Sequence, residues 1–469
     1  MSTLYESLAD ALEALIDGGV YAAGSRMPSI RALSKQRNLS VTTCVNAYHE
    51  LERRGRLESK PRAGFNVLAR SPLSFVQPST ISVRNRPTPI NTQQRIRRML
   101  EAAGDPRVVN FGAANPHPSF LPGVSLERSY RQVLRSQRHR CLGQEFPPGA
   151  IELRTVITRR LAAFQVYTSP DELLITNGCQ EAVTIALKLT TCPGDVVAIE
   201  SPTYYGLLEV LRALGLRAIE IPANSEDGIS IEALRLAATE WKVVALIIIA
   251  NHSNPLGVTL SDRKKQSILA LAEELDFSIV EDDVYGDLPI AGHRPRPLKA
   301  WDHNQRVYYC ASATKTVSPG LRIGWLLPGR GDMQKAIHLQ YVSTVSVQSV
   351  GQFVLTEYLA RSHVDRQRRL MAKEFDLCRI RMLNEIANTF PKGTQVTNPQ
   401  GGFVIWVELP HDADTVETMA RALQDGIAFA PGTLFSVNKR FKNCLRLNAA
   451  MKWSDRTRNA LGQLSEYFR

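Results

Sequence analysis

The sequence predicts an α/β protein of more than one domain, and three observations lead to this. At 469 residues the chain exceeds the usual length of a single compact domain. Between about residues 173 and 327, short apolar strands alternate with helical patterns, which is typical of a mostly parallel sheet covered on both faces. The first 68 residues instead hold short helices and two extended pieces. We therefore expect a small N-terminal unit, a large α/β domain and a smaller α+β lobe near the C-terminus.

The N-terminal unit begins with three predicted helices. Leu4, Leu8 and Leu12 recur at helical spacing, and a second helix is expected to start near Pro28 and to break before Ser40. Ser40 can cap a third helix over residues 41–54, because its hydroxyl can accept a bond from a backbone N–H of the first turn. Gly55 is the natural stop of that helix.

A basic hairpin is expected to follow the third helix. Residues 56–59 and 65–68 read as strands around the turn Lys60-Pro-Arg62-Ala-Gly64. Three helices and a basic hairpin are the layout of a winged helix-turn-helix, whose third helix enters the major groove of DNA. On pattern alone, a small helical oligomerisation module remains the alternative.

Positive charge gathers just beyond this unit. The net charge is +12, and residues 59–100 contain no acid at all. The basic residues of that stretch are Lys60, Arg62, Arg70, Arg84, Arg86, Arg95, Arg97 and Arg98. Such a bias suggests a polyanionic partner, most simply nucleic acid, although a charge run is often only a solvated linker. Within it, residues 69–92 are rich in Pro, Ser and Thr and read as a semi-extended tether.

Composition excludes several classes of protein. An apolar fraction of 44% with 22% charged residues is ordinary for a globular chain, and the longest apolar run, Val243–Ala250, is too short to cross a bilayer. The first residues do not resemble a signal peptide. The seven cysteines are scattered singly without C-x-x-C spacing, which favours reduced thiols in a cytoplasmic protein over disulfides or a structural metal. We expect neither a membrane nor a metal site.

Lys315 is the most informative residue of the large domain. It follows the apolar run Arg306–Cys310, which reads as a buried strand, so it lies just past a strand end, where open α/β sheets bind ligands. A lysine that forms a Schiff base with an aldehyde cofactor needs a desolvated position and a phosphate site beside it. Ser312 and Arg322 could supply that phosphate site, since they offer a hydroxyl and a planar guanidinium.

Further candidates follow other predicted strands upstream. The strand 173–176 leads into the turn 177–180 and a helix, an arrangement that suits phosphate because of the helix dipole. The strands 243–249 and 277–280 are each followed by polar residues at the sheet edge. The candidates are Gly178, Cys179, Gln180, Tyr204, Asn254, Asp282 and Tyr285. A carboxylate such as Asp282 could keep a pyridine nitrogen protonated, and an aromatic ring such as Tyr204 could stack on a flat cofactor.

These residues, with Thr314, Gly401–Trp406 and Cys444–Asn448, resemble the motifs of fold-type I aminotransferases of the kynurenine/aminoadipate kind over residues 109–469. The resemblance implies pyridoxal 5'-phosphate (PLP) held as an aldimine on Lys315, the catalytic lysine, with Asp282 on the pyridine nitrogen. It implies that Asn254 and Tyr285 bond the phenolic oxygen and that Tyr204 stacks on the ring. Cys179, Gln180, Ser312 and Arg322 would hold the phosphate. Arg446 would bind the carboxylate of a substrate or effector.

One position departs from that family. A tyrosine that reaches the phosphate from the partner subunit lies five residues before a glycine in these enzymes. Here the glycine corresponds to Gly149, and the position holds Gln144. This departure puts the contact between subunits in question.

The N-terminal unit resembles the GntR-type winged helix in Met27–Leu33, Leu39–Thr43, Asn46–Tyr48 and Gly55–Leu57. The resemblance implies that Arg31, Ser40, Thr42 and Thr43 approach DNA, and that Lys60, Arg62 and Gly64 form the wing. Many relatives carry an arginine where this chain has Val41, so a guanine-reading contact is expected to be missing.

Together the two resemblances identify the chain as similar to the MocR-type branch of GntR regulators. This implies a cytoplasmic, nucleoid-associated homodimer that binds operator DNA and senses an amino acid or amine through PLP, with each head on the partner's large domain. The expected division is residues 1–68 for the DNA-binding head, 69–92 for the tether and 93–469 for the PLP-binding domain. Two alternatives remain: a working aminotransferase of the kynurenine/aminoadipate type with an N-terminal appendage, and a DNA-binding protein whose second domain is only a dimerisation scaffold.

Overall fold

The structure is a computed structural model. It describes residues 4–17, 20–22, 24–60, 64–68, 78, 86–88, 104–290, 293–361, 363–410 and 413–469. Most of the expected tether, and Arg62 of the expected wing, lie outside the described residues.

The N-terminal residues form a three-helix head with a hairpin. Its elements are α1 (Leu4–Asp17), α2 (Ile30–Arg37), α3 (Val41–Arg53), β1 (Leu57–Lys60) and β2 (Gly64–Val67). The expected cap at Ser40 forms, since Ser40 accepts a bond from the Thr43 backbone N–H, and Asn38 ends α2 in the left-handed conformation. Side chains from all three helices and the hairpin share one small core, in which Leu12, Leu33 and Leu51 are fully buried.

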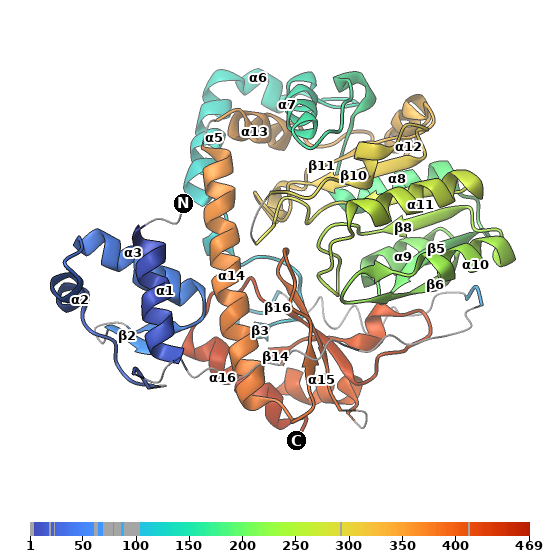
Figure 1. Cartoon of the computed structure of the whole chain (residues 1–469). Coiled ribbons are helices and arrows are strands. Elements are labelled where there is room, and N and C mark those ends of the chain that lie inside the picture. The colour runs from blue at the N-terminus through green and yellow to red at the C-terminus, as the bar shows by residue number, and fades with distance from the viewer. Residues whose placement is uncertain are drawn as a thin grey trace.

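A mixed sheet of eight strands dominates the rest of the chain (Figure 1). Its spatial order is β4 (Leu174–Thr176), β11 (Gly324–Leu327), β10 (Val307–Ser312), β9 (Ser278–Asp282), β8 (Ala245–Ile248), β5 (Val196–Ser201), β6 (Arg217–Asn224) and β7 (Gly228–Ile229). The run from β10 to β6 is parallel, whereas β11 and β7 pair antiparallel with their neighbours. The mostly parallel sheet predicted from the sequence is therefore confirmed.

Helices cover both faces of this sheet, which explains why its strands are apolar on both sides. Packed on one face are α10 (Ile231–Trp241) and α11 (Asp262–Glu274). The other face is covered by α8 (Cys179–Thr190), α9 (Tyr205–Ala213) and α12 (Met333–Thr344). Beyond β4 lie α5 (Gly123–Ser136), α6 (Arg138–Leu142), α7 (Ile151–Ala162) and α13 (Ser349–Leu359).

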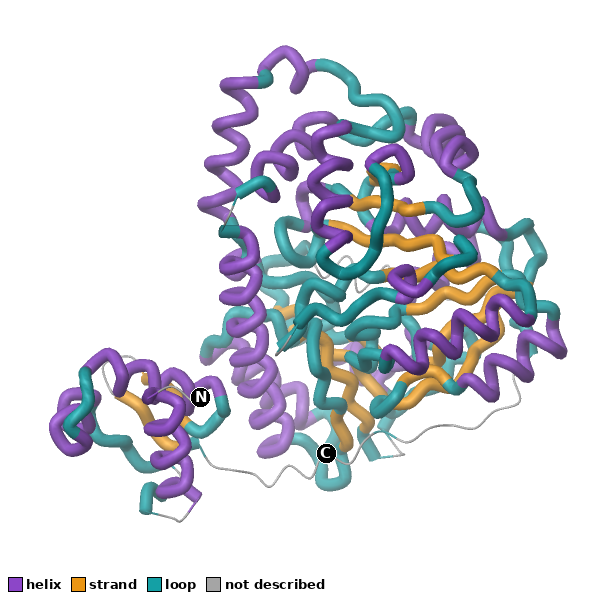
Figure 2. The backbone as a smooth tube through the Cα atoms, turned by 45° about the horizontal axis from the view of Figure 1, so that its top comes forward, coloured by secondary structure: helices purple, strands orange, loops and turns teal. Residues whose placement is uncertain are grey.

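A smaller lobe is built around a second sheet. Its strands are β12 (Gln395–Val396), β13 (Val404–Glu408), β16 (Cys444–Asn448) and β15 (Ala430–Pro431), in that order. A two-stranded sheet of β3 (Val109–Asn110) and β14 (Ile427–Ala428) adjoins it, with α15 (Thr415–Gln424) and α16 (Asp455–Glu466). The long helix α14 (Val364–Thr389) leads from α13 into this lobe and borders it along one side (Figure 2).

The head lies against the small lobe of its own chain, beside α14 and α16 (Figure 1). Arg381 of α14 pairs with Glu52 of the head, and Arg458 of α16 pairs with Glu58. Opposite charges thus meet across the junction. Farther along the chain, Thr88 bonds to Ala218 of β6, on the far side of the molecule from the head.

Candidate functional site

A cavity of about 260 Å³ opens where β9 and β10 end, between the large sheet and the small lobe. Parallel strands direct their carboxyl ends to the same edge, so residues that follow different strands converge there. The predicted residues that line the cavity are Cys179, Gln180, Tyr204, Asn254, Asp282, Tyr285, Ser312, Thr314, Lys315 and Arg322. Two other predicted residues lie next to it: Gly178 contacts Arg322, and Arg446 donates to Asn254.

One end of the cavity is built to receive an anion. Gly178 precedes α8 with a φ of +79°, and no side chain caps this helix terminus. A Cβ at Gly178 would lie 2.6 Å from Nη2 of Arg322, so the glycine lets the guanidinium lie against the start of the helix. Ser312 and Thr314 bring two hydroxyls, whose oxygens are 2.9 Å apart. Backbone N–H groups, a helix dipole and a guanidinium together suit a phosphate.

The side chains of Cys179 and Gln180 bond to protein groups and not toward the expected phosphate position. The Cys179 thiol donates to Oδ1 of Asp282 at 3.2 Å, and the Gln180 amide donates to the Gly206 carbonyl at 2.8 Å. Both residues belong to the first turn of α8, which starts earlier than the sequence indicated because Gly178 already makes the turn. Their backbone N–H groups therefore remain the groups available to a phosphate.

Asp282 is a buried carboxylate, and no cationic side chain among the described residues bonds to it. It accepts bonds from the Cys179 thiol and from the backbone N–H of Val284. Burial raises the pKa of Asp282 to about 6, because removal from water disfavours its charged form. A cationic N–H placed beside it would stabilise that charge. This is what the pyridinium nitrogen of PLP offers, so the carboxylate fits the cofactor.

Three further groups meet on the side of the small lobe. Asn254 donates to the Tyr285 hydroxyl at 3.3 Å and accepts from Arg446 at 3.1 Å. Arg446 is fully buried and also donates to the carbonyl of Gly112, and its Nε has no hydrogen-bond partner among the residues that the structure describes. A buried guanidinium with an unused N–H is suited to a carboxylate ligand.

Lys315 extends across the cavity toward the loop that follows β3. Its Nζ lies 2.6 Å from the carbonyl oxygen of Ala114 and 3.0 Å from Oδ1 of Asn115. Burial, followed by repulsion from Arg446, lowers the pKa of Lys315 to about 8. Near neutral pH such an amine is neutral in far more molecules than an ordinary lysine, and the neutral form is the nucleophile toward an aldehyde.

Tyr204 lies half-buried in the cavity wall, where a flat ring could stack on it. Its ring centroid is 4.8 Å from that of Tyr205. Gly206 has no side chain to collide with the Tyr204 ring. The position is compatible with the stacking role inferred from the resemblance.

The sequence did not indicate the loop that forms the opposite wall, which includes Ala113, Ala114 and Asn115. Asn448 holds this loop by donating to the carbonyls of Ala113 and Asn115, both at 2.8 Å. The loop has no motif of its own, and its contacts are with Lys315, about 200 positions away, and with Asn448, more than 300 positions away. Asn448 belongs to the Cys444–Asn448 motif and lies close to Arg446. It was the one residue in the sequence that could have pointed to this loop.

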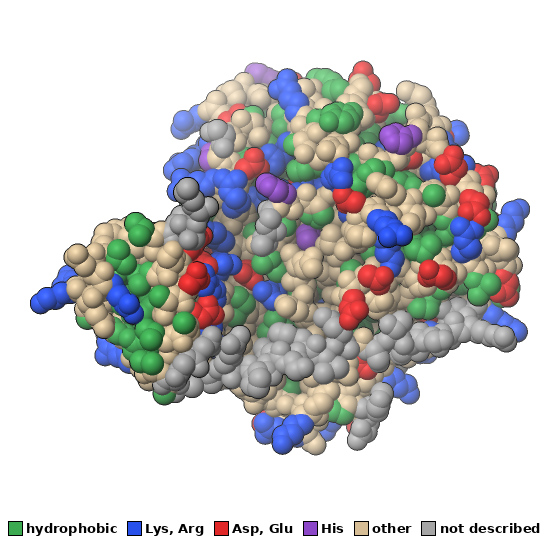
Figure 3. All heavy atoms as spheres, in the orientation of Figure 1, with side chains coloured by type: hydrophobic (Ala, Val, Ile, Leu, Met, Phe, Trp, Pro, Cys, Tyr) green, Lys and Arg blue, Asp and Glu red, His purple; other side chains and the backbone are tan. Residues whose placement is uncertain are grey.

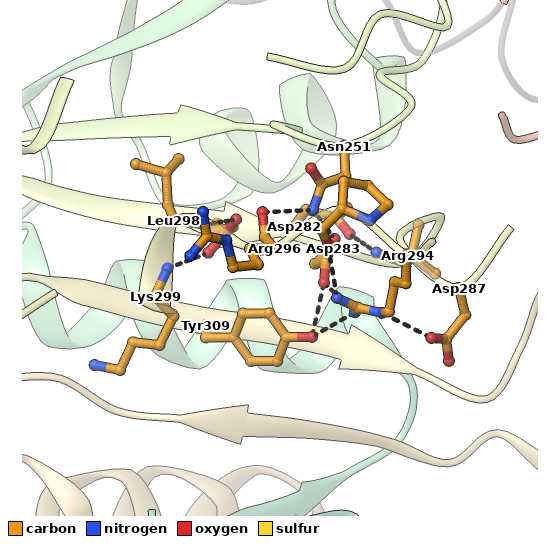
Figure 4. Close-up of polar contacts among 12 residues, drawn as sticks. Asn251, Asp282, Asp283, Asp287, Arg294, Arg296, Leu298, Lys299 and Tyr309 are labelled. Carbon is orange, nitrogen blue, oxygen red and sulfur yellow. Dashed lines mark hydrogen bonds and ion pairs between the residues drawn. The ribbon is translucent and has the colours of Figure 1, made fainter. Parts of the chain in front are cut away.

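A second buried network behind the cavity was also missed (Figure 4). Asp283 follows Asp282, yet it accepts from Asn251 at 2.9 Å, from Tyr309 at 2.8 Å and from Arg294 at 2.5 Å. Asp283 and Arg294 are buried and oppositely charged, and Asp287 bonds to the same guanidinium. This network fixes the end of β9, from which Asp282 faces the cavity.

The head presents the residues predicted to approach DNA. Arg31, Ser40 and Thr42 are exposed at the start of α2 and α3, and Thr43 is partly exposed. The Thr43 hydroxyl is 2.8 Å from that of Ser40, so these two also stabilise the helix start. Gly64 begins β2 with a φ of +84°, which favours glycine. Lys60 ends β1, but its side chain, like all of Arg62, lies outside the described part of the chain.

The two departures from family patterns lie at the surface. Val41 is 51% exposed at the first position of α3. Gln144 donates to the Ser346 hydroxyl at 3.0 Å, near the start of α13. Neither residue contacts the cavity in the single chain.

Comparison with known proteins supports both halves of this description. Residues 4–67 match the family of bacterial regulatory proteins of the gntR type, and residues 132–464 match aminotransferase class I and II. The uncharacterized HTH-type transcriptional regulator YjiR of Escherichia coli is 36% identical over 99% of this chain and 98% of its own length. A second regulator from that organism, YdcR, is 34% identical over 98% of each chain.

The chain belongs to the MocR-type GntR regulators. Its second domain has solved structural relatives that are enzymes. Pyrococcus horikoshii kynurenine aminotransferase, in complex with PMP, superposes with a TM-score of 0.75 and 27% identity, covering 81% of this chain and 95% of the enzyme. The cofactor of this MocR-type regulator is PLP, which its aminotransferase class I and II domain and the PMP-bound structural relative support, and Asp282 and Lys315 line a cavity that fits it. Among the described residues, no helix is long and apolar enough to cross a membrane.

Proposed function

We propose that this MocR-type regulator controls transcription by binding an amino acid or amine in the PLP site and transmitting that event to a DNA-binding head. The observation that supports this most directly is the presence of both sites in one chain. The reading face of α2 and α3 is exposed, and a lysine with a lowered pKa lies in a cavity whose lining includes Asp282 and Asn254.

In this proposal the roles of the cavity residues follow their positions. The phosphate is held by the first turn of α8, Arg322, Ser312 and Thr314. Asp282 keeps the ring nitrogen protonated, Asn254 and Tyr285 bond the phenolic oxygen, and Tyr204 supports the ring. Lys315 holds the cofactor covalently, and bound PLP then supplies an electrophilic carbon that an amino compound can attack.

Arg446 determines which class of ligand the proposed site prefers. A buried guanidinium with a free N–H favours ligands that carry a carboxylate beside or near the amine. Because Arg446 also bonds to Asn254 and Gly112, a carboxylate that binds it links both sides of the cavity. An effector can shift the conformation of the protein only by its different affinity for two states.

Aminotransferase activity is the second candidate. The complete set of cofactor residues favours it, since Lys315 and Asp282 are also the groups that proton transfer would use. Sustained turnover of an amino acid with a 2-oxo acid would support an enzyme with an N-terminal appendage. The relationship with YjiR and YdcR over nearly the whole chain favours the regulator.

We further propose a cytoplasmic homodimer on the nucleoid, with the division 1–68, 69–92 and 93–469 for head, tether and PLP-binding domain. Several large apolar side chains near the phosphate end are exposed in the single chain and would suit a second copy. They are Leu142, Phe146, Tyr341, Val342 and Val345. Gln144 lies among them in sequence, at the position where the family's enzymes carry the tyrosine that reaches the partner's phosphate.

A visible absorbance titration tests this function. The protein loaded with PLP is titrated with the common amino acids and amines, and Lys315→Ala is titrated in parallel. We expect at least one compound to change the spectrum of the wild type and to alter its DNA affinity. Absence of bound PLP, or DNA binding that no tested compound affects, would contradict the regulator.

A further inference from the structure

A second cavity lies behind the cofactor cavity. Its inner chamber, of about 50 Å³, is bounded by α7, by α13 and by residues at the ends of β9 and β10. The chamber adjoins a groove of about 490 Å³ between α7, α13 and the start of α14, and four residues line both: Arg160, Phe164, Leu359 and Arg368. Of the described residues, Val284 and Ser312 alone line both the chamber and the cofactor cavity.

The inner chamber combines aromatic walls with a fixed polar floor. Tyr358, which is 2% exposed, and Trp325 belong to its lining. At the floor, Arg294 and the Tyr309 hydroxyl both bond to Asp283 (Figure 4). These groups therefore hold one another in place. Flat apolar walls around such a floor favour an aromatic ligand.

Two details of the chamber indicate how a ring would lie in it. Cζ of Arg294 is 4.0 Å from the centroid of the Phe164 ring, so the guanidinium fixes that ring where the chamber meets the groove. Nε1 of Trp325 is buried and has no hydrogen-bond partner among the described residues. A buried N–H without an acceptor costs free energy, and an acceptor oxygen at the inner end of a ligand would remove that cost.

The groove is basic. Its charged lining residues are Arg159, Arg160, Arg368 and, as the one acid among those described, Asp365. Asp365 lies 3.2 Å from Arg160 and 3.8 Å from Arg368, but its side chain is 56% exposed and can turn into water when a ligand enters. Arg368 also pairs with Asp287 of the chamber at 3.0 Å, which leaves Arg159 and Arg160 as the cations most available to a ligand.

The start of α14 adds to this positive potential. No side chain caps the first turn of this long helix, so its backbone N–H groups and its dipole face the groove. Figure 3 shows basic side chains gathered around this end of α14, at the upper left of the molecule. A carboxylate is the group that such a groove favours.

We propose that the chamber and the groove form a second ligand site, which binds a small aromatic carboxylate with a hydrogen-bond acceptor at the far end of its ring, as in 4-hydroxyphenylacetate. The ring lies against Phe164 and Leu359, its far oxygen accepts from Trp325, and its carboxylate meets Arg160 beside the start of α14. The ligand needs no amino group. The site thus goes beyond the proposed function, and it stands whether or not the chain regulates transcription.

Fluorine NMR tests where the ligand binds. Protein that carries PLP is labelled with 5-fluorotryptophan at its five tryptophans, and Trp325→Phe and Trp453→Phe identify two of the ¹⁹F signals. Addition of 4-hydroxyphenylacetate should shift the Trp325 signal and leave that of Trp453, which packs in the small lobe, unchanged. A Trp325 signal that does not move at saturating ligand would overturn the site.

Calorimetric titration of the PLP-loaded protein tests the chemistry. We expect a Kd of about 1 mM or tighter for wild type, as is typical of so small a ligand. Arg160→Gln should raise this Kd about tenfold or more, because a bond between charged groups is lost. The uncharged 4-hydroxyphenylacetamide should bind wild type as weakly, and Leu359→Trp should abolish binding, since the indole fills the junction of chamber and groove.

Matched controls lie on α5. Arg131 pairs with Glu127 as Arg160 pairs with Asp365, and Leu134 is exposed on the same helix, outside the lining of both spaces. Arg131→Gln and Leu134→Trp should therefore keep the wild-type Kd. Equal losses in the controls and in the site variants would overturn the proposal.

A last arm excludes the cofactor cavity, where Arg446 could also hold a carboxylate. Protein reconstituted with N-(5'-phosphopyridoxyl)-L-alanine, which fills that cavity, should bind 4-hydroxyphenylacetate with an unchanged Kd. Loss of binding there, or no binding by the wild type, would contradict a second site. PLP absorbance shows which variants are folded. If Leu359→Trp does not load PLP, the shift of the Trp325 signal and the Kd of Arg160→Gln decide the question without it.

Discussion

Asp282 and Asp283 show how far neighbouring residues can differ in role. Successive side chains at the end of a strand face opposite sides of the sheet. Asp283 therefore enters a buried network with Arg294 and Tyr309, while Asp282 enters the cavity with a thiol and one N–H as its donors. The resemblance had already named Asp282, and Asp282, unlike Asp283, lines the cavity.

An isosteric change at Asp282 tests this assignment. In Asp282→Asn we expect PLP to remain bound, because its phosphate contacts are elsewhere, but the ring nitrogen to lose its proton at pH 8. With PLP labelled at that nitrogen, ¹⁵N NMR distinguishes the protonated from the neutral ring. A ring that stays protonated at pH 8 in the variant would show that another group is the partner.

The lowered pKa of Lys315 predicts a pH dependence of cofactor capture. Burial and Arg446 disfavour the ammonium, so the amine becomes neutral as the pH rises through about 8, well below the ordinary 10.5 of lysine. The rate at which cofactor-free protein captures PLP should therefore increase between pH 7 and 9 and level off above. Stopped-flow absorbance measures this rate, and a midpoint near 10.5 would contradict the desolvated lysine.

At the scale of elements, the sequence predicted the helix ends and the strands, which depend on residues close to them in the chain. Ser40 and Asn38 delimit α3 and α2 through caps, and apolar runs located β8, β9 and β10 within about two residues. The loop around Ala114 and the contact of α14 with the head could not be predicted in this way. Their partners are hundreds of residues away, and neither the loop nor α14 has a distinctive motif.

Substitutions at the start of α3 and at the start of α2 should affect DNA binding differently. Thr42→Ala should change the preference between sequences by about tenfold, because the start of the third helix reads bases in this type of head. Arg31→Ala should instead weaken binding to all sequences and lower the salt slope by about one, as expected for one phosphate contact. Titrations of several duplexes at several salt concentrations measure both. If both variants lost affinity uniformly, α3 would not be the reading helix.

At the scale of the whole molecule, one long helix, α14, contacts the head and also packs toward the cavity. The head lies on α14, and the same helix packs through Phe375 toward Tyr285 in the cavity. The tether leaves the head, and residues 86–88 lie at β6, across the molecule. Eighteen residues, from 69 to 86, span at most about 65 Å when extended. The head is thus connected to the large domain by a long segment and to the small lobe by direct contact.

The most direct test of the regulator is DNA affinity measured by anisotropy with and without the amino compound that changes the absorbance of bound PLP. Wild type should change its Kd by about 5- to 150-fold when the compound is added. Lys315→Ala should bind the same duplex but show no such change, because the compound no longer exchanges with a covalent lysine bond. An equal response in Lys315→Ala, or none in the wild type, would contradict a regulator that senses through PLP.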